Sequence, residues 1–216
     1  MSSGGDEHGA GTRRRGRPPG QRSEETRERI LRAARLRFSQ AGYARTSLGD
    51  IAREAGLTPR AIYHYVDSKP ELFAQAAQVA YGRWSQEVAT RVVSGKDTRS
   101  RLHGLVDVFR VLHHEDPTLV AFLSLAASEA QRNPELDVPQ PPGKDPRVTI
   151  SQTLADMAHT DGDFAPGVDP DGAAALLEVL GSGLTLLASD EREGEYMAML
   201  DVLDRVIDGT LFVDAP

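Results

Sequence analysis

The side chains best suited to chemistry lie between Thr46 and Lys69, where hydroxyl, guanidinium and ammonium groups recur over a short stretch. Such groups donate hydrogen bonds to phosphate oxygens and base edges of DNA. The chain has no G-x-S-x-G motif and no Gly-rich phosphate loop after a strand, and it contains no cysteine. The stretch therefore predicts DNA binding, and no catalytic residue is predicted.

The main alternative is an enzyme that uses His103 and Asp107 as an acid/base pair. These residues lie one helical turn apart, but a hydrogen bond at the surface or in a pocket explains the spacing equally well. His113 and His114 are adjacent and would point about 100° apart on a helix. Without a His/carboxylate cluster at ligand spacing, neither a metal site nor a cofactor is predicted.

The charge of the chain is divided unevenly. Residues 1–70 hold 14 basic and 8 acidic residues, whereas residues 71–216 hold 11 basic and 24 acidic residues. A net charge of +6 is thus followed by one of −13. A basic head on an acidic body favours a polyanionic partner for the head. The absence of cysteine, of a long apolar run and of a secretory signal predicts a cytoplasmic protein without a membrane segment.

Helical periodicity begins at Ser23, after a Gly/Ser/Arg/Pro-rich arm in residues 1–22 that we expect to be disordered. An apolar stripe marks the first helix, which Gly42 ends. The stripe consists of Ile30, Leu31, Ala34, Phe38 and Ala41. Its outer face is expected to be basic and to carry Arg27, Arg29, Arg32, Arg35 and Arg37.

Two short helices follow, separated by a turn at Gly56. Thr46 or Ser47 caps the earlier one, and Asp50 completes a capping box. The later one starts at Thr58, with Pro59 in its first turn. Small or apolar residues, Ala52, Leu57 and Ile62, are expected under both helices. This is a helix-turn-helix whose later helix turns its polar side outward, toward a major groove.

Residues 24–73 resemble the tetracycline-repressor (TetR) family. The matching motifs are Gly42–Tyr43, Thr46–Ser47, I-A-R-E-A-G at 51–56, Y-H-Y at 63–65 and S-K-P-E-L-F at 68–73. Val66 departs from the pattern, since the family more often has Phe there, and we expect this to alter packing only. The resemblance implies an all-α fold with an N-terminal three-helix helix-turn-helix domain and a C-terminal helical ligand-binding and dimerisation domain.

The resemblance also implies roles for single residues. Thr46 and Ser47 look like phosphate contacts at a helix N-terminus, and Lys69 like a second phosphate clamp. Tyr63 and Tyr65 look like phosphate or base-edge contacts. Thr58, Arg60 and His64 are candidates for reading bases, with Arg60 placed at a guanine. For each residue a structural role, as a cap, a solvated charge or part of the core, remains the alternative.

The N-terminal arm offers a second signal for DNA. Arg15-Gly16-Arg17-Pro18 looks like the core of an AT-hook, in which Arg15 and Arg17 lie in a narrow A·T-rich minor groove. The alternative is a nonspecific basic tail. We therefore divide the chain into an arm (1–22), a DNA-binding domain (23–68) and a regulatory and dimerisation domain (69–216).

The body carries helical spacing over 69–93, 98–115, 117–132, 146–159, 171–189 and 194–212. Its middle helices are expected to enclose a cavity for an unknown small-molecule effector, although core packing explains the same residues. The candidates for its lining are Tyr81, Trp84, Phe109, His113, Phe122 and Met157.

The last two helices are expected to pair with a second copy of the chain, because the helix around Leu180 is apolar on nearly all sides. In TetR-like proteins the corresponding helices form a four-helix bundle, whereas a core within one chain is the alternative. The expected interface residues are Leu176, Leu180, Gly183, Leu184, Leu187, Leu200, Leu203, Ile207 and Leu211. The predicted protein is a homodimeric regulator, most simply a repressor, that binds a palindromic double-stranded DNA operator and is released by its effector. An activator and a nonspecific architectural DNA binder remain alternatives.

Overall fold

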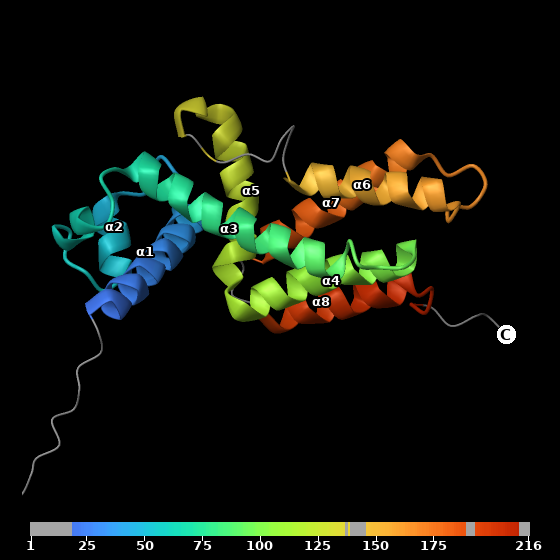
Figure 1. Ribbon diagram of the computed structural model, residues 1–216, viewed down its shortest axis with the longest axis horizontal. Helices are drawn as coiled ribbons and strands as arrows, with labels where there is room; N and C mark the ends of the chain where they lie inside the picture. The colour runs from blue at the N-terminus through green and yellow to red at the C-terminus, as the bar shows by residue number, and fades with distance from the viewer. Residues whose placement is uncertain (1–18, 137, 139–145, 189–192, 212–216) are drawn as a thin grey trace, which may run out of the picture.

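The computed structural model describes residues 19–136, 138, 146–188 and 193–211. These residues form eight α-helices and two 3₁₀-helices, and no strand occurs among them (Figure 1). The α-helices are α1 (Pro19–Ala41), α2 (Leu48–Glu54), α3 (Lys69–Arg91), α4 (Thr98–Glu115), α5 (Pro117–Arg132), α6 (Pro146–Asp161), α7 (Pro170–Leu187) and α8 (Glu193–Ile207). The 3₁₀-helices are η1 (Ala61–His64) and η2 (Pro134–Leu136). The predicted all-α fold is confirmed.

The first helix begins earlier than the sequence predicts. α1 starts at Pro19, so residues 19–22 are helical and Ser23 lies inside the helix rather than at its cap. Proline suits the first turn of a helix, where its missing N–H needs no partner. At the other end Gly42 adopts a φ of 80° and donates its N–H to the Phe38 carbonyl at 2.8 Å, which ends α1 as predicted.

Side-chain caps set the starts of the next helices. Ser47 and Asp50 form the predicted capping box at α2, and Ser68 caps α3 by accepting the Glu71 N–H. Aspartates, which the sequence analysis did not single out, cap α4, α5 and α7. These caps satisfy N–H groups that a helix leaves unpaired at its first turn.

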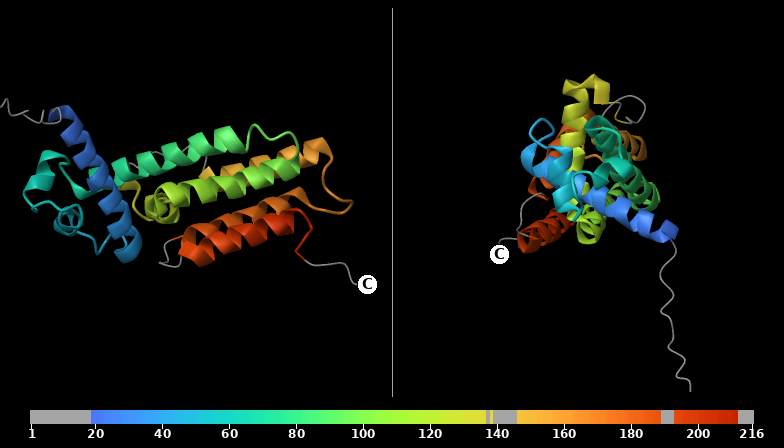
Figure 2. Two further views of the ribbon diagram at one scale, coloured as in Figure 1. Left: turned by 90° about the horizontal axis from the view of Figure 1, so that it is seen from below. Right: turned by 90° about the vertical axis from the view of Figure 1, so that its left-hand side faces the viewer.

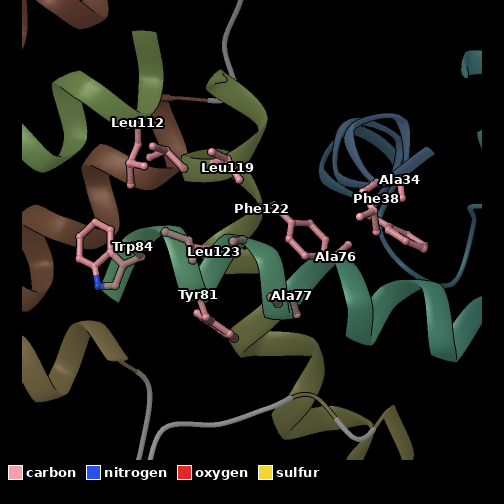
Figure 3. Packing of buried hydrophobic residues seen from close by; sticks show 14 of the residues in the cluster. Ala34, Phe38, Ala76, Ala77, Tyr81, Trp84, Leu112, Leu119, Phe122 and Leu123 are labelled. Atoms are coloured by element: carbon pink, nitrogen blue, oxygen red, sulfur yellow. The ribbon is translucent and has the colours of Figure 1, made fainter. Parts of the chain in front are cut away.

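A long apolar core joins the head, formed by α1, α2 and η1, to the body, formed by α4–α8. α3 runs from the head into the body, and α5 crosses it (Figures 1 and 2). At the junction Phe38, Phe73 and Phe122 pack together, with 5.0 Å between the ring centroids of Phe38 and Phe73 and 5.1 Å between those of Phe73 and Phe122. Figure 3 shows Phe38 of α1 and Phe122 of α5 at this junction. The head and the body therefore share one continuous core.

The last helix ends before the predicted limit of residue 212. α8 ends at Ile207, because Gly209 adopts a φ of 68° and the Thr210 N–H bonds the Arg205 carbonyl at 2.8 Å. Leu211 thus lies beyond α8 instead of extending its apolar stripe. Among the described helices none is long and apolar enough to span a bilayer.

Candidate nucleic-acid interface

The helix-turn-helix is held together by apolar side chains beneath it. Ile51, Ala52 and Ile62 are completely buried against α1. Gly56 adopts a φ of 68° at the turn, and the Leu57 N–H closes it on the Ala52 carbonyl at 2.8 Å. Both the left-handed turn and the buried residues agree with the sequence prediction.

The later helix is a single 3₁₀ turn, shorter than the α-helix predicted from Thr58. Thr58 precedes it and accepts the Ala61 N–H on both its carbonyl and its hydroxyl oxygen, at 3.0 Å and 3.2 Å. The Tyr65 N–H bonds the Ile62 carbonyl at 2.9 Å, which is the i to i+3 pattern of a 3₁₀-helix. Only four residues lie in η1, so its polar side chains are presented on a very short turn.

The predicted DNA-contacting residues lie on the outward side of η1 and of the residues directly before it. Thr58, Arg60, Tyr63 and His64 are exposed, and the Tyr63 side chain remains 59% exposed despite its size. Within the described part of the chain, the side chains of Arg60, Tyr63 and His64 make no hydrogen bond or ion pair. Their donors and acceptors are therefore free for a ligand.

Thr46 and Ser47 are already engaged inside the domain. Thr46 is buried, and its hydroxyl lies 3.1 Å from the Arg37 carbonyl and 2.9 Å from the Gly42 carbonyl. A hydroxyl has one proton, so a phosphate contact from the buried Thr46 side chain would require the loss of these bonds. Ser47 is exposed, but its hydroxyl is shared with Asp50 in the capping box. The structural role of both residues is thus the one that the contacts favour.

Lys69 and Tyr65 flank η1. The Lys69 Nζ donates to the Tyr43 carbonyl at 3.1 Å and lies 4.2 Å from the centroid of the Tyr43 ring. An ammonium has three N–H donors, so this bond leaves two that point elsewhere. Burial, followed by the negative charges of Glu135 and Glu129, raises the pKa of Tyr43. Tyr65 is half-buried and packs on the core.

The outer face of α1 is basic, with one exception. Arg27, Arg29 and Arg32 are exposed and Arg37 is half-buried, but Arg35 is only 5% exposed, contrary to the prediction. Its guanidinium bonds Asp116 at 2.6 Å and Thr118 at 3.0 Å in the body. Arg35 lies four residues after Leu31 and three before Phe38, on the apolar side of the helix, but its partner Asp116 lies 81 positions away and is not marked by any local pattern. Arg15 and Arg17 of the arm lie outside the described residues.

Most residues predicted to line an effector cavity are buried in the body. Tyr81, Trp84, Phe109 and His113 are each at most 8% exposed, and the Trp84 and Phe109 rings meet edge to face at 5.1 Å. Met157 is half-buried on α6. Phe122 lies apart from these residues, in the aromatic cluster with Phe38 and Phe73.

Tyr196 is a buried polar residue that the sequence analysis missed. Its ring stacks on His113, with 4.3 Å between the centroids, and its hydroxyl is buried without a hydrogen-bond partner among the described residues. Burial raises the pKa of Tyr196 far above its ordinary value. No motif surrounds Tyr196 in the sequence, because its environment is created by the packing of α8 on α4.

The predicted dimer residues divide into two groups. Leu176, Leu180 and Leu187 on α7 are 60%, 39% and 42% exposed, and Gly183 is half-buried between them. Leu184 and Leu200 are instead buried in the core, while Leu203 and Ile207 pack on its edge. The stripe predicted on α8 therefore faces α4 within the same chain, and the exposed face of α8 carries Val202 and Val206. Periodicity identified the stripe, but it does not say which neighbour covers it.

The proposed acid/base pair does not form. His103 lies 2.7 Å from Asp204 of α8 and 2.9 Å from Asp208, just after α8, whereas Asp107 pairs with Arg110 at 2.5 Å. The hydrogen bonds to Asp204 and then to Asp208 raise the pKa of His103. The described residues hold no group of three or more His, Asp or Glu side chains arranged for a metal ion.

Comparisons with known proteins match the head most closely. The family model of bacterial regulatory proteins, tetR family, matches residues 30–76. The HTH-type transcriptional regulator AcrR of Shigella flexneri is 47% identical over 55 residues, which cover 26% of this chain and 26% of AcrR. Curated relatives are matched over about a quarter to about half of their length. Sequence similarity thus concentrates in the helix-turn-helix.

Solved structures match nearly the whole chain in fold. The MbdR regulator from Azoarcus sp. CIB superposes with a TM-score of 0.67 at 20% identity, over 87% of this chain and 100% of its own. The transcriptional regulator FadR from Bacillus subtilis, solved in complex with stearoyl-CoA, gives 0.61 at 14% identity, over 86% and 99%. These matches are regulators rather than enzymes, in agreement with the prediction that the chain is not an enzyme.

Proposed function

Because the chain belongs to the tetR family of bacterial regulatory proteins, we propose that it is a homodimeric transcriptional repressor that reads a palindromic operator. The main support is that Arg60, Tyr63 and His64, at the outer surface of η1, are exposed and unpaired among the described residues. Arg60 donates two parallel hydrogen bonds to a guanine, and Thr58 and His64 read neighbouring base edges. The bacterial chromosome lies in the cytoplasm, which is where such a protein would act.

Phosphate contacts hold the reading surface in register. Lys69 supplies one, since two of its N–H donors remain after the bond to Tyr43. The exposed Tyr63 and the half-buried Tyr65 flank it. The capped start of α2 at Ser47 lies on the same helix-turn-helix, but Thr46 acts through its internal hydrogen bonds, not through phosphate. The arm adds Arg15 and Arg17 in the minor groove of A·T-rich flanks.

A second copy of the chain completes the reading surface. One η1 spans few base pairs, so two copies related by two-fold symmetry are needed for a selective site. Support comes from α7, where Leu176, Leu180 and Leu187 are apolar and exposed. In the dimer these residues, with Val202 and Val206 of α8, are buried against the partner chain, and this burial brings the two heads to a fixed spacing.

The effector binds in the body. Tyr81, Trp84, Phe109 and Met157 provide apolar lining. His113 and the Tyr196 hydroxyl, which has no partner within the described part of the chain, provide polar contacts. A buried hydroxyl without a partner is costly, and a ligand that bonds it recovers that cost. FadR of Bacillus subtilis was solved with stearoyl-CoA, which illustrates that a body of this fold accommodates a large amphiphile. Ligand releases operator only if it favours a different head spacing.

Selection of duplexes from random DNA by the purified chain tests the proposal. An inverted repeat is expected, with binding that weakens when either half-site is scrambled. Binding that depends on salt but not on sequence would identify a nonspecific architectural protein instead. Transcription from a promoter that contains the selected site then separates repression from activation, since a repressor lowers the yield of transcript.

The role of the arm is tested by removal of residues 1–18. Affinity should fall on operators with A·T-rich flanks and stay nearly constant on those with G·C-rich flanks. An equal loss on both would indicate a nonspecific basic tail.

A further inference from the structure

Two separate contacts join α1 of the head to α5 of the body. The first is apolar and joins Phe38 to Phe122, whose ring centroids are 6.2 Å apart (Figure 3). The second is polar and joins Arg35 to Asp116 and Thr118. Arg35 lies one turn before Phe38 on α1, and Thr118 lies one turn before Phe122 on α5. The two contacts therefore join the same pair of helices one turn apart.

The polar contact of Arg35 with Asp116 and Thr118 restricts the angle between the two helices. The hydrophobic effect itself is not directional, whereas a planar guanidinium donates hydrogen bonds only along its fixed N–H directions. Arg35 uses two of these directions, with Nη2 on Asp116 at 2.6 Å and Nε on Thr118 at 3.0 Å. The Thr118 hydroxyl in turn donates to Asp116 at 2.7 Å, so the acceptors are themselves held in place.

Asp116 stands where α4 and α5 meet. Its backbone N–H bonds the Leu112 carbonyl and so closes α4, while its carboxylate accepts the Thr118 N–H and caps α5. α4 packs on α8, and α5 packs on α7. A change in the angle between these helix pairs therefore reaches Asp116 and, through it, Arg35.

Space beside the contact leaves room for such a change. An open cleft of about 720 Å³ lies between α1, α3 and the α4–α5 corner, and Arg35, Asp116 and Leu119 form part of its wall. Two further cations lie at the corner: Arg32 of α1 is 3.5 Å from Asp116 but its side chain is 62% exposed, and Arg83 of α3 pairs with Glu115. The buried Arg35 is thus the group that fixes the corner to the head on this side.

We infer that Arg35 is a positioning residue, which sets the angle of the head on the body by holding α1 to the corner between α4 and α5. It forms a second connection, parallel to the continuous helix α3, by which the state of the body reaches η1. The contact itself is independent of DNA; its effect on operator choice rests on the proposed function.

The test replaces both charges at once, so that neither is left buried alone. Arg35→Met fills the space of the side chain, and Asp116→Asn retains a residue that caps helices well. Arg101→Met is the matched control, because Arg101 is also buried and bonds Asp161 at 2.6 Å, but within the body. The chain has no cysteine, so Gln40→Cys in the head and Lys96→Cys in the body can carry spin labels.

Two measurements follow on each protein. The first is the distribution of distances between the labels at 40 and 96, in samples diluted with unlabelled chain. The second is the ratio of affinities for the selected operator and for the same operator with one base pair inserted between its halves. A broader distance distribution and a ratio about tenfold lower, equivalent to about 1.4 kcal/mol, are expected for the Arg35/Asp116 variant but not for Arg101→Met.

A folded Arg35/Asp116 variant with an unchanged distance distribution would overturn the inference, as would the same broadening in the Arg101→Met control. If the wild-type chain selects no operator, the proposed function fails while the distance measurement still decides the role of Arg35. If the double variant does not fold, Thr118→Val replaces it, since this change removes only one acceptor. A smaller broadening is then expected, and none would contradict the inference.

Discussion

In the head, the polar side chains on the outside of η1 have no partners within the described residues, whereas in the body those of α4 are paired with α8. Arg60 and His64 illustrate the first case. Arg110, bonded to Asp204 at 2.7 Å, and His103, bonded to the same residue, illustrate the second. These polar groups at η1 are thus left for an outside ligand, whereas Arg110 and His103 hold helices of the body together.

The apolar side chains show the opposite distribution. Ile51, Ile62 and Phe38 in the head are completely buried, while Leu176, Leu186 and Val179 on α7 are between 60% and 71% exposed. Monomeric proteins rarely leave such a contiguous apolar surface in water. The head thus buries its apolar side chains and exposes polar ones on η1, whereas the body exposes an apolar face on α7, as the proposed division between DNA reading and dimerisation requires.

Phe38→Ala should destabilise both regions, because Phe38 belongs to the core that the head and the body share. Removal of a buried phenylalanine costs about 3–5 kcal/mol, a large part of the total stability of roughly 5–15 kcal/mol. Urea unfolding followed by circular dichroism measures the loss. Tyr63→Ala is the control and should change stability by less than about 0.5 kcal/mol, since Tyr63 is exposed. Equal effects of the two changes would contradict the assignment of Phe38 to a shared core.

Leu180→Glu tests the body alone. A carboxylate on the exposed face of α7 should weaken dimerisation by about 2–4 kcal/mol without unfolding the chain. Sedimentation velocity over a range of concentrations detects the shift to monomer. Val79→Glu is the control, because Val79 is 38% exposed, close to the 39% of Leu180, but lies on α3. A variant that stays dimeric at every concentration would remove α7 from the interface.

Arg60→Ala tests the head alone. The loss of a two-pronged contact with guanine should cost about 1–3 kcal/mol and relax the choice of base at one position of each half-site. Titration of operators that differ at single positions measures both effects. Arg99→Ala removes the same charge from the body and should leave the preference intact. A uniform loss over all operators would instead make Arg60 a phosphate contact.

His103→Gln tests whether the polar contacts between α4 and the end of α8 stabilise the body in a pH-dependent way. Since hydrogen bonds to Asp204 and Asp208 raise the pKa of His103, its contribution to stability is complete below the unfolded pKa of about 6.5. This contribution disappears as the pH rises through the folded pKa. His103 is 31% exposed, so the contribution should stay below about 1 kcal/mol.

Urea unfolding of the wild type and of the His103→Gln variant at about pH 5.5 and about pH 8.5 checks this sign. The wild type should be stabilised relative to the variant at the lower pH only. A stability difference that is independent of pH would show that His103 contributes through packing.

The features that the sequence predicted well depend on local interactions. The turn at Gly56, the capping box of Ser47 and Asp50, and the burial of Ile62 each follow from residues within about a turn of one another. The limits of α4 and α5 follow from the same short-range preferences, whereas α8 ends five residues before its predicted limit of residue 212. The start of α1 was missed because the glycines and prolines of the arm outweighed the helix-compatible residues directly after Pro19.

The features that the sequence did not reveal depend on distant partners. Arg35 bonds Asp116, which lies 81 positions away, and a charged residue on an amphipathic helix is usually solvated. For Thr46 the sequence leaves a phosphate contact and a structural role open, and only the tertiary structure shows its hydroxyl bonded to carbonyls of α1 and of the following turn. Leu200 belongs to a clear apolar stripe, yet only the tertiary structure shows that α4 covers it.

Guanine methylation interference on the selected operator tests whether η1 contacts base edges. The central claim is that the outer surface of η1 lies against base edges in the major groove, twice in each complex. Methylation of guanine N7 should block binding at two symmetric positions, one helical turn or about 10–10.5 base pairs apart, and Arg60→Ala should abolish this sensitivity. Interference at no guanine of a guanine-containing site, or in one half alone, would contradict the account.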